Sequence, residues 1–482
     1  MTAAKTLSRI TLGLNLILGQ GFVLASEVRG HAAIHQSPTG IAESCVALAP
    51  APGAVYSKAD QQEEAQLCMI DFYSGDFALC PKVFSTSPGT LIYDISAGAY
   101  AGRSSEFEDE QCSVRRITHS NVTGDPVSYK MTMNAEDTSA TFAPAALLYY
   151  HFSRYLVTDV DVPVSVYRSM DRRQHLERVA LRGESLSRRP GSSPMLRAGW
   201  ELLAAADRDP AAYRPIDELF TADRRQIFGV LLRERGSRYG PEINGTRRSG
   251  WGAGQNRDFQ ETAPYLALRF DGPLLAAVEQ GVREAKQDPD LGQSMGTDPS
   301  PVQMIYWMKE LTEIVLLDFI FSQQDRVGNI DYENYWYWVD QGQVRRAPAA
   351  QSSPPEKIAG KQPIRLRRTR INDNDAGGRL AYANFAKTTG MLEKFRHFGP
   401  ETYTRLLRLS DDISRGGEFY KWLQSSFGLS QAQLSQISKN TTQATATLQL
   451  ACLEGRLRFD LRPEDLLIDG AVPEFDVGCH DN

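Results

Sequence analysis

Two short polar runs in the second half of the chain hold the residue types that transfer phosphoryl groups. Residues 325–329 read Asp-Arg-Val-Gly-Asn, and residues 373–378 read Asp-Asn-Asp-Ala-Gly-Gly. In phosphoryl transfer, one carboxylate orients the attacking hydroxyl, while an Asn and a second Asp hold the metal ion on the ATP phosphates. The order of the two runs predicts Asp325 as the catalytic carboxylate, and Asn329 and Asp373 as the metal ligands.

The first run leaves the choice of metal ligand open. Asn329 follows Asp325 by four positions, whereas kinase loops place this Asn five positions after the Asp. Asp331 and Asn334 are therefore alternative ligands. Asp325 and Asn329 could also form a simple hydrogen-bonded turn, because both residue types favour turns.

The second run has alternative interpretations of its own. Asp373 follows a strand-like stretch, and Gly377 and Gly378 allow the backbone to turn sharply after it. Asp375 is a second candidate ligand. A surface turn or a calcium site built from oxygen ligands would use the same residue types, although the twelve-residue spacing and terminal Glu of an EF-hand are missing.

Lys130 is the lysine that the same chemistry needs upstream. Residues 127–133 alternate between apolar and polar side chains, which predicts a strand with Lys130 on its polar face. A strand at 90–95 precedes it, and a helix at 142–156 and a strand at 162–167 follow. Strand, helix, strand is the order of a kinase small lobe, so we predict that Lys130 contacts the ATP phosphates. A solvated lysine at a sheet edge is the alternative.

The expected carboxylate partner of Lys130 is not evident on the helix that follows. Residues 142–155 contain no acidic residue, and Glu136 and Asp137 lie before the helix. We predict Glu136 as the partner in the nucleotide site. Gly89, Gly98 and Gly102 lie where a glycine-rich phosphate cover would be, without its usual spacing. The missing helix glutamate and the shortened Asp325–Asn329 spacing favour a second function: an inactive kinase-like module that binds nucleotide or protein.

The two runs and their flanks resemble a known family. Residues 317–321, Leu-Asp-Phe-Ile-Phe, lead to Asp325-Arg326, and residues 372–377 follow a strand. This pattern is similar to secretory-pathway kinases of the four-jointed and Golgi casein kinase type, over about residues 300–410 and more weakly over 125–171. The resemblance implies a two-lobed α+β protein-kinase-like fold with insertions. It also implies ATP with Mg²⁺ or Mn²⁺, and a Ser/Thr hydroxyl of a protein or a glycan hydroxyl as the acceptor.

Hydrophobic periodicity predicts the elements that position the runs. Ser300 and Gln303 predict a capping box, and an apolar stripe predicts a helix that ends before Asp325. Strands are expected at 335–339 and 364–371, and helices at 216–234, 271–286 and within 390–450. The arginines of the second strand predict either a solvated sheet edge or recognition of an acidic substrate; they are Arg365, Arg367, Arg368 and Arg370.

Composition bounds the compartment and the partners. The net charge of −6 gives no global basic signature for nucleic acid. Lys5 and Arg9 before an apolar stretch predict a cleaved signal peptide over residues 1–25, and no later stretch is long and apolar enough to span a bilayer. We therefore expect a secreted, periplasmic or secretory-lumen protein with no stable membrane span. The sequence does not indicate an oligomeric state.

The cysteines support an oxidising compartment. Their number is even and no C-x-x-C pair occurs, which favours disulfides over a zinc site. The spacing predicts one C-terminal bridge, Cys452–Cys479, and two bridges among the first four cysteines, which are Cys45, Cys68, Cys80 and Cys112.

The predicted domain organisation has six parts. They are a signal peptide, a Cys-containing N-terminal segment, a small lobe, a helical insertion, a large lobe and a Cys-bearing tail, at residues 1–25, 26–88, 89–184, 185–299, 300–450 and 451–482.

Overall fold

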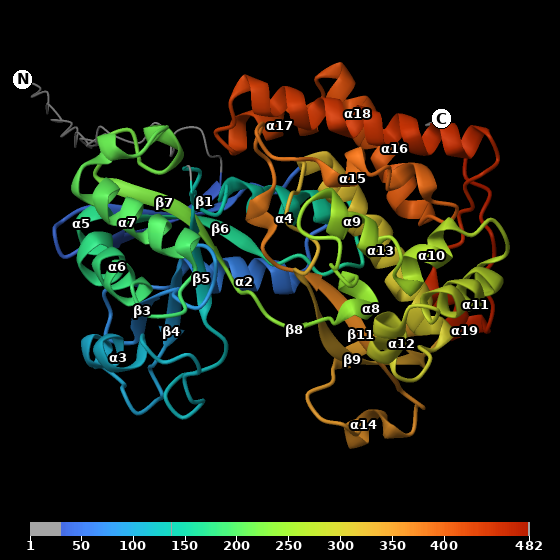
Figure 1. Cartoon of the computed structure of the whole chain (residues 1–482), viewed down its shortest axis with the longest axis horizontal. Coiled ribbons are helices and arrows are strands. Elements are labelled where there is room, and N and C mark those ends of the chain that lie inside the picture. Colours follow the sequence, from blue (N-terminus) through green and yellow to red (C-terminus); the bar gives the residue numbers. More distant parts are fainter. Residues whose placement is uncertain (1–29, 136, 481–482) are drawn as a thin grey trace, which may run out of the picture.

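The computed structural model describes residues 30–135 and 137–480, in which helices and sheets form two bodies (Figure 1). The predicted two-lobed α+β architecture is confirmed. The expected signal peptide and Glu136 lie outside the described residues. Within those residues, no helix combines the length and apolarity that crossing a bilayer requires.

The first body is built on a seven-stranded sheet in which every neighbouring pair is antiparallel. Its order is β1-β2-β6-β7-β5-β4-β3. The strands are β1 (Gly30–Gln36), β2 (Ala42–Leu48), β3 (Phe77–Pro81), β4 (Thr90–Asp94), β5 (Val127–Met131), β6 (Ser165–Asp171) and β7 (Gln226–Leu232).

The predicted order of strand, helix and strand is confirmed in this body. Strand β5 leads to helix α4 (Pro144–Leu156), which leads to β6. Pro144 lies in the first turn of α4, where its missing N–H costs no hydrogen bond. Nearly every side chain of α4 is buried, so the helix lies in the core that joins the two bodies.

The predicted helix over residues 216–234 is wrong, because its second half is strand β7. Residues 227–232 form an almost uninterrupted apolar run, which suits a strand buried on both faces. β7 lies between β6 and β5. Gly229 allows the close approach to β5, since a Cβ there would be 2.2 Å from the carbonyl oxygen of Lys130.

Two disulfides attach the N-terminal segment to the sheet, which confirms two bridges among the first four cysteines. Cys45–Cys68 joins β2 to the end of helix α2 (Lys58–Cys68), and Cys80–Cys112 joins β3 to the end of helix α3 (Ser104–Gln111). The segment therefore supplies β1, β2 and β3 to the sheet itself.

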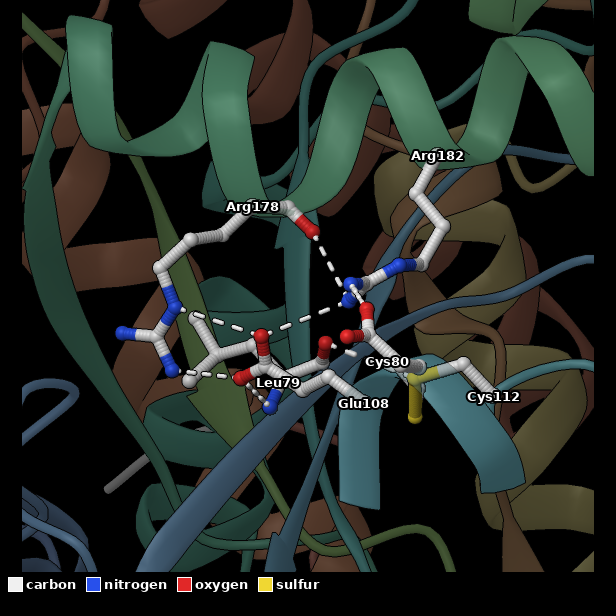
Figure 2. The surroundings of a disulfide bond; sticks show 7 residues. Leu79, Cys80, Glu108, Cys112, Arg178 and Arg182 are labelled. Atoms are coloured by element: carbon white, nitrogen blue, oxygen red, sulfur yellow. Dashed lines mark hydrogen bonds and ion pairs between the residues drawn. A yellow bond between two sulfur atoms is a disulfide. The ribbon is translucent and has the colours of Figure 1, made fainter. Parts of the chain in front are cut away.

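Glu108 reinforces the second of these bridges (Figure 2). Its buried carboxylate accepts from the backbone N–H of Leu79 at 2.8 Å and pairs with Arg178 at 2.5 Å and Arg182 at 3.3 Å. The two arginines come from the helical run that follows β6, so Glu108 connects that run to edge strand β3.

The second body surrounds helix α13 (Pro301–Phe321), whose side chains are almost all buried. Ser300 caps it by accepting from the N–H of Gln303, but the predicted capping box is incomplete. The Gln303 side chain instead exchanges two hydrogen bonds with the backbone of Arg367. Other helices of this body include α9 (Ala253–Phe259), α10 (Ala263–Arg269), α11 (Leu274–Ala285), α12 (Pro289–Met295), α15 (Phe385–Thr388), α16 (Pro400–Arg415), α17 (Glu418–Ser426), α18 (Gln431–Leu453) and α19 (Pro463–Asp469).

A smaller sheet adjoins α13 and confirms the two strands predicted there. Its order is β10-β9-β11, and β8 (Ser237–Arg238) also pairs with β9. The strands are β9 (Ile330–Asp340), β10 (Gln343–Pro348) and β11 (Ile364–Ile371). The Cys452–Cys479 bridge, predicted from the spacing, links α18 to the C-terminal tail.

The basic strand β11 differs from the predicted solvated edge. Arg368 and Arg370 face Asp161, with Arg370 almost fully buried, and Arg367 pairs with Glu242 at 3.0 Å. Only Arg365 is exposed. These charges therefore connect the bodies through the loop between α4 and β6.

Candidate phosphoryl-transfer site

Lys130 contacts one carboxylate of its own body and two carboxylates of the second body. Its Nζ lies 2.5 Å from Glu234 Oε1, 2.8 Å from Asp373 Oδ1 and 2.9 Å from Asp375 Oδ1. The lysine is only 6% exposed. Burial alone would lower its pKa, but the carboxylates outweigh burial and raise the pKa well above its usual value. Lys130 is thus a fixed cation that contacts Asp373, while its predicted contact with ATP phosphates stays a prediction.

Glu234 is the partner of Lys130 that sequence reasoning missed. It lies two residues after β7, and the pairing of Ser128 with Leu232 brings this strand end beside Lys130. The carboxylate also accepts from Ser128 at 3.1 Å and pairs with Lys82 at 3.6 Å. The signal for Glu234 in the sequence is its position just after the apolar run 227–232. The prediction of a helix over residues 216–234 hides that signal.

Asp373 follows β11 in a left-handed backbone conformation, with φ of 51°. Its side chain is 34% exposed, the most accessible carboxylate around Lys130. Burial would raise its pKa, but Lys130 and Lys82 hold the pKa well below the usual range. Asp373 is therefore ionised at neutral pH. Burial raises the pKa of Asp375, which lies deeper.

The Asp325 loop is tied directly to the Asp373 loop. The N–H of Asp325 donates to Gln323 Oε1 at 3.0 Å, and Gln323 Nε2 donates to the carbonyl of Asp373 at 3.3 Å. The backbone of Gln324 donates to Ala376 at 3.1 Å. These bonds place both predicted aspartates at one site.

The carboxylate of Asp325 has the properties of a proton acceptor. Burial, with the nearby charge of Asp373, raises its pKa, while the indole N–H of Trp251, 3.4 Å from Oδ1, acts in the opposite direction. A raised pKa makes a carboxylate a stronger base toward a hydroxyl proton.

Arg326 packs beneath the Asp325 loop. The guanidinium is buried and contacts both oxygens of Asp318 at 3.1–3.3 Å. It also donates to the carbonyl of Asn372 at 2.8 Å and to Asn374 Oδ1 at 2.7 Å. One side chain therefore connects α13, the Asp325 loop and the Asp373 loop.

The oxygen atoms of Asn329 and Asp331 already have hydrogen-bond donors. Asn329 Nδ2 donates to the carbonyl of Asp325 at 2.7 Å, and its Oδ1 accepts from Arg238 at 2.6 Å. Asp331 accepts from Arg238 at 2.5 Å and from Asn372 at 2.7 Å. To ligate a metal, Asn329 would have to share its amide oxygen, which has two lone pairs, with the Arg238 guanidinium, so its role stays a prediction. Asn334, the other alternative, lies further along β9 opposite Arg367.

The side chains fit a metal that arrives with its nucleotide better than a metal held by protein alone. Among residues 30–135 and 137–480, no group of three or more His, Cys, Asp or Glu is arranged to hold an ion. Mg²⁺ needs only one or two carboxylates when phosphates and water complete its coordination. The accessible, ionised Asp373 suits that arrangement.

The loop between β3 and β4 lies beside the Lys130 cluster, because its Lys82 reaches Glu234. The N–H of Lys82 donates to the carbonyl of Gly89 at 2.7 Å, and the Lys82 ammonium reaches Glu234. Of the three predicted glycines, Gly89 therefore belongs to this loop. Gly98 packs on the backbone of Asn121, and Gly102 approaches Gly75.

Comparisons with known proteins give a distant likeness. No protein-family model matches the sequence, and no curated protein matches it. Two solved structures are similar to the chain: a Golgi casein kinase with Mn/ADP bound and a Golgi casein kinase. The first is 10% identical, with 84% of this chain and 79% of that chain covered and a TM-score of 0.42. The second is 11% identical, with 84% and 78% covered and a TM-score of 0.43. A likeness at this level carries no chemistry, which rests on the side chains of this chain alone.

Proposed function

We propose that the chain is an extracytoplasmic kinase that uses ATP with Mg²⁺ or Mn²⁺ to phosphorylate a hydroxyl group of a protein Ser/Thr or of a glycan. The observation that carries the proposal is the convergence of Lys130, Glu234 and Asp373 beside the Asp325 loop. A fixed cation, an ionised carboxylate and a carboxylate with a raised pKa are the groups that phosphoryl transfer needs.

Each group has a separate task in this proposal. Lys130 holds the phosphates, with Glu234 fixing its position, and Asp373 holds the metal that neutralises phosphate charge. Asp325 accepts the proton of the acceptor hydroxyl while the hydroxyl oxygen attacks the terminal phosphorus of ATP. The new oxygen–phosphorus bond forms as the bond to ADP breaks, so positioning and charge neutralisation supply most of the catalysis.

The three disulfides support the proposed compartment, because such bridges persist in oxidising surroundings. In the proposed domain division, the small lobe carries Lys130, and the large lobe carries Asp325 and Asp373. A calcium site held by the Asp373 loop alone is disfavoured, because Ca²⁺ takes six to eight oxygen ligands and the described residues contain no group of three or more His, Cys, Asp or Glu arranged to hold an ion.

An inactive, nucleotide-binding module is the second candidate, and one observation favours it. The Arg238 guanidinium donates to the amide oxygen of Asn329, so a cation already lies beside the oxygen that an active kinase would direct at the metal.

Two assays decide between the candidates: thermal stabilisation by Mn²⁺ with ATP, and transfer of labelled phosphate to proteins and glycans. Stabilisation together with transfer supports the kinase, and stabilisation without transfer supports the inactive module. The absence of any stabilisation rejects both.

A further inference from the structure

Trp251 is an exposed aromatic residue at the edge of the proposed catalytic carboxylate. Its side chain is 66% exposed, and its indole Nε1 lies 3.4 Å from Asp325 Oδ1. The ring meets Phe385 edge to face, with ring centroids 5.7 Å apart. An acceptor that approaches Asp325 would therefore meet this exposed ring.

The segment that carries Trp251 is firmly attached to the Asp325 loop. We call residues 237–252 the clamp segment. Asn244, which is 3% exposed, accepts from the N–H groups of Gly328 at 2.9 Å and Ile330 at 3.2 Å. Its Nδ2 donates to the carbonyls of Tyr239 at 2.9 Å and Ile330 at 3.1 Å. Asn244 is thus fully hydrogen-bonded and joins the clamp segment to the loop.

Two arginines of the clamp segment close on the same loop. Arg238 donates to the carbonyl of Gly328 and, at 2.6 Å, to Asn329 Oδ1. The Arg247 guanidinium packs against Gly328, where a Cβ would lie 2.4 Å from Arg247 Nη1. The φ of +91° at Gly328 also favours glycine there.

The end of the clamp segment is anchored beside Trp251. Ser249 donates to Asp258 through its N–H at 2.8 Å and its hydroxyl at 2.6 Å, which ties the segment to α9. Gly252 then turns with φ of +87° and faces Phe385. The indole is therefore held at the site by its backbone while its face stays open.

We propose that Trp251 positions the acceptor for transfer: its N–H orients the Asp325 carboxylate, and its open face contacts the acceptor beside the attacking hydroxyl. This inference rests on the proposed kinase function. A separation of 3.4 Å is long for a hydrogen bond, and bonds of this kind shorten when the substrate completes the site. Trp251 thereby acts on the acceptor and on Asp325, whereas Lys130 and Asp373 act on the nucleotide.

Two substitutions separate the N–H from the ring, in the full-length protein. Trp251→Phe keeps an aromatic ring and removes the N–H, and Trp251→Ala removes both. Met69→Ala is the control, because Met69 is 72% exposed and lies at the end of α2, outside the site. Both side chains to be replaced are exposed, so the fold should survive in all three variants.

The first measurement is a carbon-13 NMR titration of the Asp325 carboxyl group, with Asp325→Asn used to assign the signal. Because the indole hydrogen bond lowers the pKa of Asp325, that pKa should rise in both Trp251 variants and stay unchanged in Met69→Ala. If the ring acted only through packing, the pKa of Asp325 would be the same in Trp251→Phe as in the wild type.

The second measurement is steady-state kinetics with Mn²⁺ and ATP. Affinity for Mn-ATP should change less than about twofold, and hydrolysis with water as acceptor should fall about tenfold in both Trp251 variants. With a Ser/Thr peptide or a pyranoside that the wild-type protein phosphorylates, the acceptor KM should rise about tenfold in Trp251→Ala and much less in Trp251→Phe.

An unchanged Asp325 titration in Trp251→Phe, together with an unchanged acceptor KM in Trp251→Ala, overturns the inference. A wild-type protein that does not bind Mn-ATP instead refutes the proposed function. The NMR titration does not need turnover, so it still decides whether the indole acts on Asp325.

Discussion

Lys130 and Glu234 form a 2.5 Å ion pair between two strands that are neighbours in the sheet and distant in the sequence. The glutamate comes from the end of β7, whereas helix α4 has no acidic residue to offer. The lysine of the site is therefore positioned by the sheet, and its two other carboxylates arrive from the Asp373 loop of the second body.

We expect Glu234→Gln to lower the transfer rate by about 10-fold to 100-fold, because Lys130 would shift toward Asp373 and Asp375. Loss of this ionic contact should cost about 1–3 kcal/mol of unfolding free energy, since two carboxylates remain. Initial rates and urea unfolding check both values. Glu63→Gln is the control, because Glu63 pairs with Arg233 and Arg235 at 3.8 Å outside the Lys130 cluster. Equal losses of transfer rate and unfolding free energy in Glu234→Gln and Glu63→Gln would contradict a specific role of Glu234.

Asp325 and Asp373 should separate catalysis from binding. Asp325→Asn should keep Mn-ATP affinity within a few-fold while transfer falls by about 10²-fold or more, the scale of lost general-base assistance. Asp373→Asn should weaken Mn-ATP binding itself, because the carboxylate that holds the metal is lost. Calorimetric titration and initial rates on both variants measure this division. Large and equal losses of affinity would refute it.

Glu310 should make stability depend on pH. Its side chain is fully buried on α13, accepts from the N–H of Thr369 at 3.1 Å, and leaves Oε2 without a partner among the described residues. Burial raises its pKa from 4.5 to about 8. The folded state thus holds a proton that the unfolded state releases, so unfolding free energy should fall as pH rises from about 4.5 to about 8.

Glu310→Gln tests this dependence, because the amide cannot ionise. The variant should be within about 1 kcal/mol of the wild type at pH 5 and more stable than it by about 1–3 kcal/mol at pH 8. Urea unfolding at the two pH values gives the comparison. The same difference at both values would mean that Glu310 does not titrate on unfolding.

Removing one disulfide should destabilise the protein without unfolding it. The paired substitution Cys452→Ala with Cys479→Ala opens a bridge of sequence separation 27 and should cost about 2–4 kcal/mol. Urea unfolding measures the loss. Thiol titration of the unfolded, unreduced wild type is the control, and the finding of six free thiols would contradict the bridges.

The sequence predicted the parts of the site whose signal is local. Asp325, Asp373 and Lys130 could be found because each follows or occupies a recognisable element, and β11 was predicted to its last residue. Glu234 and Trp251 could not be found in this way, because their roles come from contacts across the chain. Strand β7 was mistaken for a helix because a short apolar run does not distinguish the two without its neighbours.

The buried contacts of Arg326 also limit how the site can change. One guanidinium fastens α13, the carbonyl of Asn372 and the side chain of Asn374 together. Asp325 and Asp373, the proposed proton acceptor and metal carboxylate, therefore lie on two loops that the same buried side chain connects. Under the proposed function, substitutions that adapt the protein to a larger or differently shaped acceptor must keep these Arg326 contacts and change residues of the clamp segment instead. Within that proposal, the clamp segment is the place to begin when altering the choice of acceptor.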